Sequence, residues 1–467
     1  MSADKKAAFT ARRILIVEDD YYFRIALEKS LQQLKHEPVC AENVAHAKQL
    51  LGLEKFDLVI SDIRMPDETG IQLLQWIKAN RPLPVVLMTG FSNISEAHEA
   101  AQIGADGFLA KPFKKEELEQ AIESSIQKNE PTDSEPASLD SEYCKISMDD
   151  FVSGREMQYD IFIRVSEMKY VKIAHRGEDI AQDRIQAYKV KGIMFLYMQK
   201  EDFKKYLGLN LVLVGAVMRA KKFDQKKKLH LVKHTSEVML QSLYKSDIDE
   251  ELFQQAGALV ENAVSIVADC EGTMDLLAAL SSHTDHLYIH SVGVSMYSVL
   301  IGKALGWNSP TTIFKLALGG MLHDIGKKEL PVELLNKSRS ELTADEVTAY
   351  ETHPGRGAEI LSAVEGIPTD ILQITNEHHE NCLGLGYPAH LRRMKIHPLA
   401  RVVAVANEFC SLVLKNPNSP GMKPAEAIQR MLSLHPEHYE ETSLQALIKV
   451  FKLDMVVPSR HNPEGTA

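Results

Sequence analysis

Apolar and polar positions follow two different rules in the two halves of this chain. Over residues 13–126, short apolar runs typical of buried strands alternate with amphipathic helical stretches. The strand candidates cover residues 14–17, 57–61, 84–88 and 107–110, and the clearest helices between them cover residues 22–34 and 70–80. This alternation predicts a doubly wound α/β domain, in which a parallel sheet carries helices on both faces.

The pattern changes after residue 127. Residues 127–142 (QKNEPTDSEPASLDSE) are rich in Pro, Ser and acids and lack periodicity, which predicts a flexible linker over residues 128–144. Period-two alternation at residues 159–165 and 170–174, followed by a strand running into a helix over residues 191–207, predicts a small α/β middle domain. We place this domain at residues 145–225, and no catalytic set of residues identifies its role.

From about residue 230 onward, apolar residues recur at spacings of three and four, and strand signals are nearly absent. We therefore expect an all-α domain over residues 230–455. The basic run at 219–230 precedes it and is interpreted as the solvated face of a helix that connects the two ends of the protein.

Composition narrows the possible functions. A chain of 467 residues is long enough for several domains. The net charge of −11 and the lack of a helix-turn-helix pattern argue against DNA as a partner. The five cysteines contain no CxxC pair, and the longest apolar run (211–218) is too short for a membrane span. With no signal-peptide pattern at the N-terminus, we expect a cytoplasmic protein.

Polar residues follow the predicted strands of the N-terminal domain. Glu18 and Asp19 follow the first strand candidate, Asp62 the second, Thr89 the third and Lys111 the fourth. The carboxyl ends of parallel strands meet at one edge of a sheet, where ligands gather. Grouped carboxylates suit Mg²⁺, and a lysine and a hydroxyl beside them can position a phosphoryl group on a carboxylate.

With these residues in this order, residues 10–127 resemble a response-regulator receiver domain. The resemblance implies a parallel five-stranded sheet, a bound Mg²⁺, and a sensor histidine kinase or phosphotransfer protein as partner. It implies roles for Asp62 as the phosphorylated residue, for Glu18, Asp19 and Asp62 in Mg²⁺ binding, and for Thr89, Phe108 and Lys111 in the switch.

The C-terminal half concentrates its histidines in short polar motifs on separate predicted helices. Imidazole and carboxylate ligands together suit Fe, Mn or Zn, and a set of this size can surround two metal ions. Asp324 has two oxygens and is a candidate bridge between them. Lys327 lies one turn after His323, where it can neutralise charge on a phosphate.

These motifs resemble the HD-GYP family of metal-dependent phosphohydrolases. The matching segments are YIHS (288–291), LHDIGK (322–327), HPGRG (353–357), HHE (378–380) and GYP (386–388). The resemblance implies a bacterial phosphodiesterase that opens cyclic di-GMP at a centre of two or three Fe, Mn or similar divalent ions. It implies metal ligation by His290, His323, Asp324, His353, His378, His379 and, weakly, Asn407, phosphate contact by Lys327, and a substrate rim of Gly386, Tyr387 and Pro388. A homodimer and protein docking through the GYP loop are also expected.

Four positions depart from the family pattern and keep two functions open. Asn407 stands where the family has an aspartate, Asn416 where it has an arginine, and Leu383 where it has an acid. His286, one turn before His290, is either an additional ligand or a solvated residue at the start of a helix. The chain is therefore either a response regulator in which phosphorylation of Asp62 controls hydrolysis, or a catalytically impaired output that senses the nucleotide or docks a protein.

Overall fold

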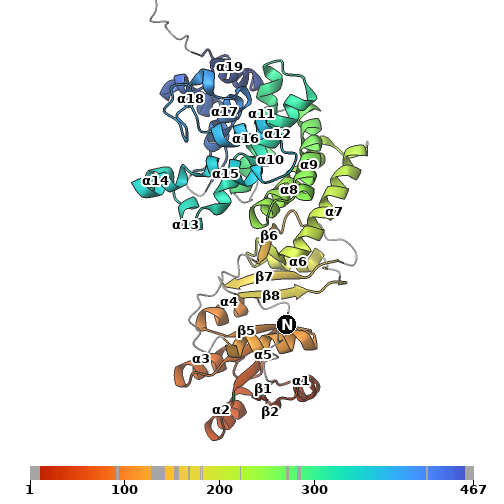
Figure 1. Ribbon diagram of the computed structural model, residues 1–467. Helices are drawn as coiled ribbons and strands as arrows, with labels where there is room; N and C mark the ends of the chain where they lie inside the picture. Colours follow the sequence, from red (N-terminus) through yellow and green to blue (C-terminus); the bar gives the residue numbers. More distant parts are fainter. Residues whose placement is uncertain are drawn as a thin grey trace, which may run out of the picture. The chain divides into compact units, whose positions relative to one another are not determined.

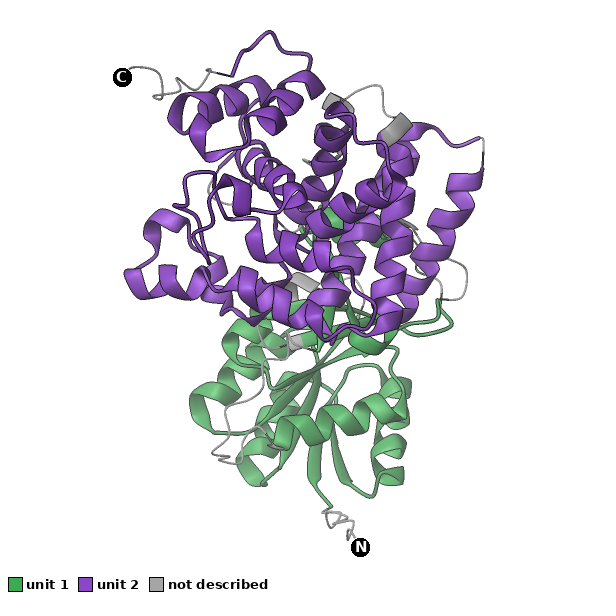
Figure 2. Cartoon of the chain, turned by 45° about the horizontal axis from the view of Figure 1, so that its top comes forward, with its two compact units in different colours: residues 1–203 green, residues 204–467 purple. Residues whose placement is uncertain are grey.

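The computed structural model describes residues 11–90, 94–127, 142–151, 157–166, 169–178, 180, 182–220, 222–269, 273–280, 286–416 and 419–457. The chain forms two compact units, residues 1–203 and residues 204–467 (Figure 2). Most of the predicted linker, residues 128–141, lies outside the described residues.

The first unit begins with the predicted doubly wound domain (Figure 1). Its elements are β1 (Arg13–Val17), α1 (Tyr21–Gln33), β2 (Glu37–Ala41), α2 (Val44–Leu53), β3 (Leu58–Asp62), α3 (Gly70–Asn80), β4 (Val85–Gly90), α4 (Ile94–Ile103), β5 (Gly107–Lys111) and α5 (Lys115–Gln127). The strands pair in the order β2-β1-β3-β4-β5, and every pairing is parallel. The predicted parallel five-stranded sheet is confirmed.

Buried apolar residues lie on both faces of this sheet because alternate strand residues point in opposite directions. Leu15 and Val59 pack in one core with residues of α2, α3 and α4. Ile14 and Ile60 pack in the other with residues of α1 and α5. Two covered faces explain why the strands appear in the sequence as continuous apolar runs.

A second, smaller sheet completes the first unit. Its elements are β6 (Tyr143–Ser147), β7 (Ile161–Ser166), β8 (Lys169–Ala174), α6 (Gln182–Val190) and β9 (Phe195–Gln199). The strand order is β6-β9-β7-β8 and the pairings are antiparallel. The predicted strands at 159–165 and 170–174 correspond to β7 and β8, whereas β6 begins inside the predicted linker.

The described residues of the second unit form helices joined by loops, with two isolated bridges in place of any strand, and this agrees with the predicted all-α domain. Its helices are α7 (Lys200–Arg219), which starts in the first unit, α8 (Gln225–Lys245), α9 (Glu250–Asp269), α10 (Thr273–Leu280), α11 (His286–Ala304), α12 (Pro310–Leu322), η2 (Ile325–Glu329), α13 (Val332–Leu335), η3 (Arg339–Glu341), α14 (Ala344–Tyr350), α15 (His353–Ser362), α16 (Thr369–Glu377), η4 (Arg393–Lys395), α17 (Pro398–Val413), α18 (Pro424–Leu434), η5 (Pro436–His438) and α19 (Glu441–Val450).

Helix α11 lies in the middle of this unit and packs against α8, α9, α12, α17 and α19. All residues from 288 to 299 of this helix are buried, including Ser291, Ser295 and Ser298. A helix that is buried on all sides places any polar group it carries in the interior. Among the described residues, no helix has the length and apolar content needed to cross a membrane.

Candidate phosphoacceptor site and metal centre

The sheet of the first unit brings the predicted polar residues to one edge. Glu18 follows β1, Asp62 ends β3, and a carboxylate oxygen of each lies within 4.8 Å of one from Asp19. Oxygen ligands at this spacing fit Mg²⁺. Glu18 is buried, and this burial raises the pKa of its carboxyl group despite the opposing effect of Lys111.

Lys111 joins the buried Glu18 to the partly exposed Asp62 at this edge. Its Nζ lies 2.7 Å from Oε2 of Glu18 and 2.6 Å from Oδ2 of Asp62. The same ammonium lies over the ring of Phe23, 4.3 Å from the centroid. A lysine held in this way lies beside any phosphoryl group attached to Asp62.

The two other predicted switch residues lie on the neighbouring strands β4 and β5. The hydroxyl of Thr89 is buried and donates to the carbonyl of Gly90 at 3.1 Å. Phe108 is half-buried and packs against the core beneath α2, α3 and α4. Gly70 permits the start of α3 to approach β3, because a Cβ there would lie 2.0 Å from the carbonyl oxygen of Asp62.

In the second unit, all six predicted His and Asp ligands come together. They form two overlapping groups. The first contains His290, His323 and Asp324, and the second contains Asp324, His353, His378 and His379. Within each group, one ligand atom of each residue lies within 4.8 Å of those of the others. Asp324 belongs to both groups, as expected of a bridging carboxylate. We call these six residues the metal-ligand cluster.

Helix ends supply most of this cluster. His323 follows the last residue of α12, His353 opens α15, and His378 follows the last residue of α16. Only His290 lies inside a long helix, α11. Side chains at helix ends can face one point from several directions, and the packing of these helices fixes that point.

Hydrogen bonds to the backbone orient three of the imidazoles. The Nδ1 atoms of His323, His353 and His378 lie 2.7–2.8 Å from the carbonyl oxygens of Gly320, Tyr350 and Thr375. A carbonyl accepts only, so each Nδ1 carries the proton and each Nε2 presents a lone pair. Histidine ligands of metal ions are commonly oriented in this way, because the ring nitrogen that does not bind the metal donates to a carbonyl.

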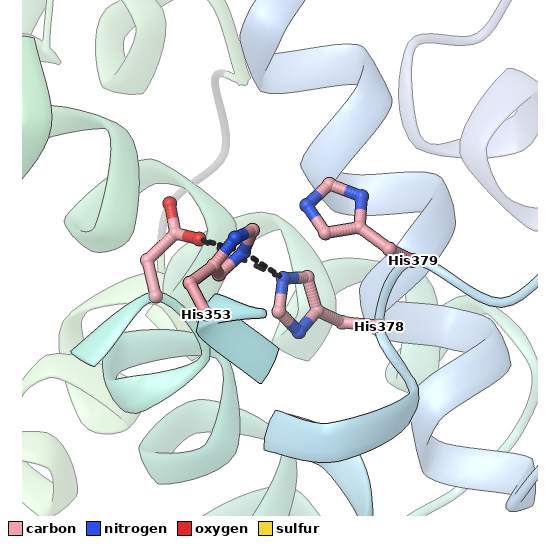
Figure 3. A group of neighbouring side chains, drawn as sticks. His353, His378 and His379 are labelled. Atoms are coloured by element: carbon pink, nitrogen blue, oxygen red, sulfur yellow. Dashed lines mark hydrogen bonds and ion pairs between the residues drawn. The ribbon is translucent and has the colours of Figure 1, made fainter. Parts of the chain in front are cut away.

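The resulting lone pairs face one another. Nε2 of His353 lies 3.3 Å from Nε2 of His378, and 3.2 Å from Oδ1 of Asp324 (Figure 3). Nε2 of His323 and Nε2 of His379 are buried without a hydrogen bond among the described residues. Buried acceptors that converge without a donor are costly unless a cation lies between them. The cluster therefore fits divalent metal ions.

Burial favours the neutral form of His290, His353, His378 and His379. It lowers the pKa of His290 and of His378 to about 3, and it also lowers the pKa values of His353 and His379. Burial alone raises the pKa of Asp324, but the neighbouring imidazoles and Lys327 bring it well below its usual range. Neutral imidazoles and an ionised carboxylate are the forms that bind metal.

Asn407 lies in α17 at the edge of the cluster. Its Oδ1 is 2.8 Å from Nε2 of His290, and the residue is 8% exposed. The amide therefore adjoins the cluster, at the position for which the family resemblance implies a weak metal ligand. An amide oxygen carries no net charge, so it holds a hard cation less strongly than a carboxylate does.

Lys327 follows the cluster on η2. Its Nζ lies 2.6 Å from Oδ2 of Asp324 and 5.3 Å from the ring centroid of Tyr350. Burial alone lowers the pKa of Lys327, but the carboxylate of Asp324 raises this pKa above its usual value. The side chain is only 11% exposed, so its charge is fixed at the cluster.

The GYP segment packs directly on His379. The rings of Tyr387 and His379 stack with centroids 4.6 Å apart, and the backbone N–H of Tyr387 donates to the carbonyl of His379 at 3.3 Å. A Cβ on Gly386 would lie 2.3 Å from that same carbonyl oxygen. Only glycine allows this approach, which explains the residue before Tyr387.

Two glycines let η2 and α15 approach each other within the cluster. A Cβ on Gly326 would lie 2.0 Å from the carbonyl oxygen of His353 and 2.5 Å from the nitrogen of Gly357. Asp324 immediately precedes η2 and His353 opens α15, so this contact sets the distance between Asp324 and His353.

The other departures from the family pattern lie outside the six-residue cluster. Leu383 is 40% exposed and pairs with Arg392 in an isolated bridge. Asn416 pairs with Ser419 through backbone hydrogen bonds. The ring of His286 stacks on that of His290 with centroids 6.2 Å apart, so it adjoins the cluster.

Three residues beside the cluster were not predicted from the sequence. Tyr244 of α8 donates its hydroxyl to the carbonyl of Asp324 at 2.7 Å. The buried Glu380 accepts from the backbone N–H groups of Ala389 and Leu391 and so orders the chain after the GYP segment. Arg339 contacts Tyr387. Glu380 lies within a quoted motif, whereas nothing in the spacing of Tyr244 and Arg339 distinguishes them from ordinary helix and turn residues.

Fold and site together define a protein that joins a doubly wound domain with carboxylates grouped at one sheet edge to a helical domain with a histidine- and aspartate-rich cluster suited to metal. The comparisons agree with this class. Residues 14–123 match the model of the response regulator receiver domain, and residues 276–442 match that of the HD domain. The chain is thus a receiver-domain protein that also carries an HD domain, as the sequence motifs indicated.

Several known proteins resemble parts of the chain. A cyclic di-GMP phosphodiesterase of Thermotoga maritima is 24% identical over 97% of this chain and 94% of its own length. The cyclic di-GMP phosphodiesterase PA4108 of Pseudomonas aeruginosa is 30% identical over 42% of this chain, and the match spans only 46% of PA4108. Among solved structures, Bd1817, an HD-GYP-type protein from Bdellovibrio bacteriovorus, superimposes with a TM-score of 0.53 at 20% identity and covers 66% of this chain and 99% of its own. At that identity the likeness concerns the fold.

Proposed function

We propose that this chain is a response regulator in which phosphorylation of Asp62 controls a metal-dependent cyclic di-GMP phosphodiesterase of the HD-GYP type. The observation that carries the proposal is the convergence of Nε2 lone pairs and an ionised carboxylate around Asp324, with Lys327 fixed beside them. The relatives named as cyclic di-GMP phosphodiesterases support the choice of substrate.

In the receiver domain, Glu18, Asp19 and Asp62 would hold Mg²⁺. A sensor histidine kinase or phosphotransfer protein donates the phosphoryl group to a carboxylate oxygen of Asp62. Lys111, already 2.6 Å from that carboxylate, then pairs with the phosphoryl oxygens and leaves Glu18. Mg²⁺ when bound offsets the charge of the phosphoryl group.

In the HD domain, the six-residue cluster would hold two divalent ions, Asp324 being shared between them. Such ions, when bound, polarise a phosphodiester and activate water for attack on phosphorus. Lys327 contributes a fixed positive charge for the phosphate oxygens. Tyr387 covers His379 and so limits the access of solvent to one side of the cluster.

Metal content and hydrolysis of cyclic di-GMP, measured together, test this proposal. The full chain is loaded with Mn²⁺ or Fe²⁺ and assayed beside Asn407→Asp, which adds a carboxylate 2.8 Å from the His290 ring. We expect metal binding and turnover in the wild type, with more of both in Asn407→Asp. Asn262→Asp adds the same charge on α9 as a control. A metal-loaded wild type that hydrolyses no cyclic di-GMP would contradict the proposal.

The alternative is a catalytically impaired output that binds the nucleotide or docks a protein. The uncharged amide of Asn407 beside His290 favours it, because Asp324 is then the one carboxylate among the predicted ligands. Turnover in Asn407→Asp but not in the metal-loaded wild type, with nucleotide binding in both, would decide for this alternative.

A further inference from the structure

Arg339 lies at the rim of the metal-ligand cluster and has no role in the function proposed above. It opens η3, the short helix between α13 and α14. Its guanidinium lies over the ring of Tyr387, 5.3 Å from the centroid, and its Nη1 donates to the Tyr387 hydroxyl at 3.3 Å. Its Nη2 forms an ion pair with Glu351. The group is therefore held in place by two different partners.

The position of Arg339 is fixed relative to the metal ligands because Tyr387 is fixed. The Tyr387 ring stacks on His379, and its backbone N–H is bonded to the His379 carbonyl. Guanidinium, phenol and imidazole thus follow one another from the rim to the cluster. A movement of Arg339 away from the cluster breaks its contact with the phenol.

Arg339 differs from Lys327 in its exposure to solvent. The Lys327 side chain is 11% exposed and its ammonium is bound to Asp324. The Arg339 side chain is 56% exposed, although two of its nitrogens have partners. A planar guanidinium has five N–H donors, so Arg339 keeps N–H groups for an anion that arrives from solvent.

Each of these two cations lies against a phenol. The ring of Tyr350 is next to Lys327, and the ring of Tyr387 is next to Arg339. Tyr350 also packs edge-on against His353, while Tyr387 stacks on His379. The cations therefore flank neighbouring members of the same cluster, one buried beside it and one at its solvent-facing edge.

We infer that Arg339 binds the second, non-reacting phosphate of a two-phosphate cyclic dinucleotide while the first phosphate lies at the cluster beside Lys327. This inference rests on the proposed function, since it names how the same site holds that substrate. A guanidinium recognises a phosphate diester through two N–H groups at once. Glu351 orients the Arg339 guanidinium and gives up part of its contact with that group when the phosphate binds.

Binding to the full, Mn²⁺-loaded chain tests this inference with two probes. Cyclic di-GMP carries two phosphates, and bis(p-nitrophenyl) phosphate carries one. Arg339→Ala should weaken cyclic di-GMP binding about tenfold, the loss expected for one charge-assisted hydrogen-bonded contact, and should weaken the single-phosphate probe less. Arg339→Lys should recover part of the loss, because lysine keeps the charge without the fork.

Lys337→Ala is the matched control, because Lys337 is an exposed cation two residues away whose partner is Glu346. It should bind both probes as the wild type does. If Arg339→Ala weakens both probes equally, Arg339 only supports Tyr387 and the inference is wrong. If Arg339→Ala binds cyclic di-GMP as the wild type does, the inference fails while the proposed function stands. A wild type that takes the single-phosphate probe but not cyclic di-GMP overturns the proposed function and this inference with it.

Discussion

Nε2 of His353 lies 3.3 Å from Nε2 of His378, while Nδ1 of each ring is bonded to a backbone carbonyl three residues earlier in the chain. Since both Nδ1 atoms carry protons, the two facing atoms are both acceptors. A pair of acceptors at this distance repels unless a cation or a proton separates them. The consequences of this arrangement can be measured.

Metal ions should stabilise the protein markedly. A ligand that binds only the folded state at a hundred times its dissociation constant adds about 2.7 kcal/mol to the free energy of unfolding. We expect Mn²⁺ to raise the melting temperature of the HD domain and EDTA to reverse the effect. His353→Ala should lose this response, because it removes an Nε2 that faces both Asp324 and His378. A melting temperature indifferent to metal in the wild type would argue against a metal centre.

Acid should destabilise the metal-free protein. Burial lowers the pKa of His290 and of His378 to about 3 in the folded state, below the usual value near 6.5 of an unfolded chain. Between these values the unfolded state binds more protons, so the free energy of unfolding falls as the pH falls. Each group contributes about 1.4 kcal/mol per pH unit in this window. Above pH 7 the contribution is complete and the dependence disappears.

Denaturant unfolding in EDTA at several pH values between 5 and 8 measures this slope. His378→Gln removes one of the rings whose pKa is lowered in the folded state, and should flatten the slope relative to the wild type. Equal stability of the wild type at pH 5 and pH 8 would show that these imidazoles are not held neutral.

Gly326→Ala should disrupt the metal-ligand cluster. The new Cβ would lie 2.0 Å from the carbonyl oxygen of His353, so η2 and α15 must separate. Overpacking of this kind costs about 1–3 kcal/mol of stability, and the displaced Asp324 should bind less metal. Unfolding and metal content are measured together. Gly355→Ala is the control on the facing helix α15, since the nearest contact of its new Cβ would be an ordinary 3.9 Å. Similar behaviour of the two variants would contradict the close approach.

Asp62→Asn should uncouple the output from phosphorylation. A small-molecule phosphodonor such as acetyl phosphate should change cyclic di-GMP hydrolysis by the wild type and leave that of Asp62→Asn unchanged, because an amide accepts no phosphoryl group. Asp57→Asn is the control, since Asp57 precedes β3 at the opposite end of the strand and bonds the backbone of Arg13. A response that persists in Asp62→Asn would place the phosphorylated residue elsewhere.

The sequence determined the architecture of the first unit because buried parallel strands leave continuous apolar runs. Four of the five strands were predicted within two residues of their ends. The fifth, β2, was not located because it is an edge strand, Glu37–Ala41, which begins with Glu and Pro and is only partly buried. The antiparallel order of the middle sheet was also beyond prediction, since period-two alternation does not specify which strands pair.

For the second unit, the sequence by itself determined which residue types are available for metal, because imidazole and carboxylate groups gather in short motifs on separate apolar helices. The resemblance of these motifs to the HD-GYP family implied which of them are ligands. Only the tertiary structure decided that Asp324 belongs to both ligand groups, that the Nε2 atoms face inward, and that Arg339 reaches Tyr387. Arg339 and Tyr387 are 48 residues apart. Their contact depends on how the segments around η3 and Gly386 pack, and local sequence carries no signal of that packing.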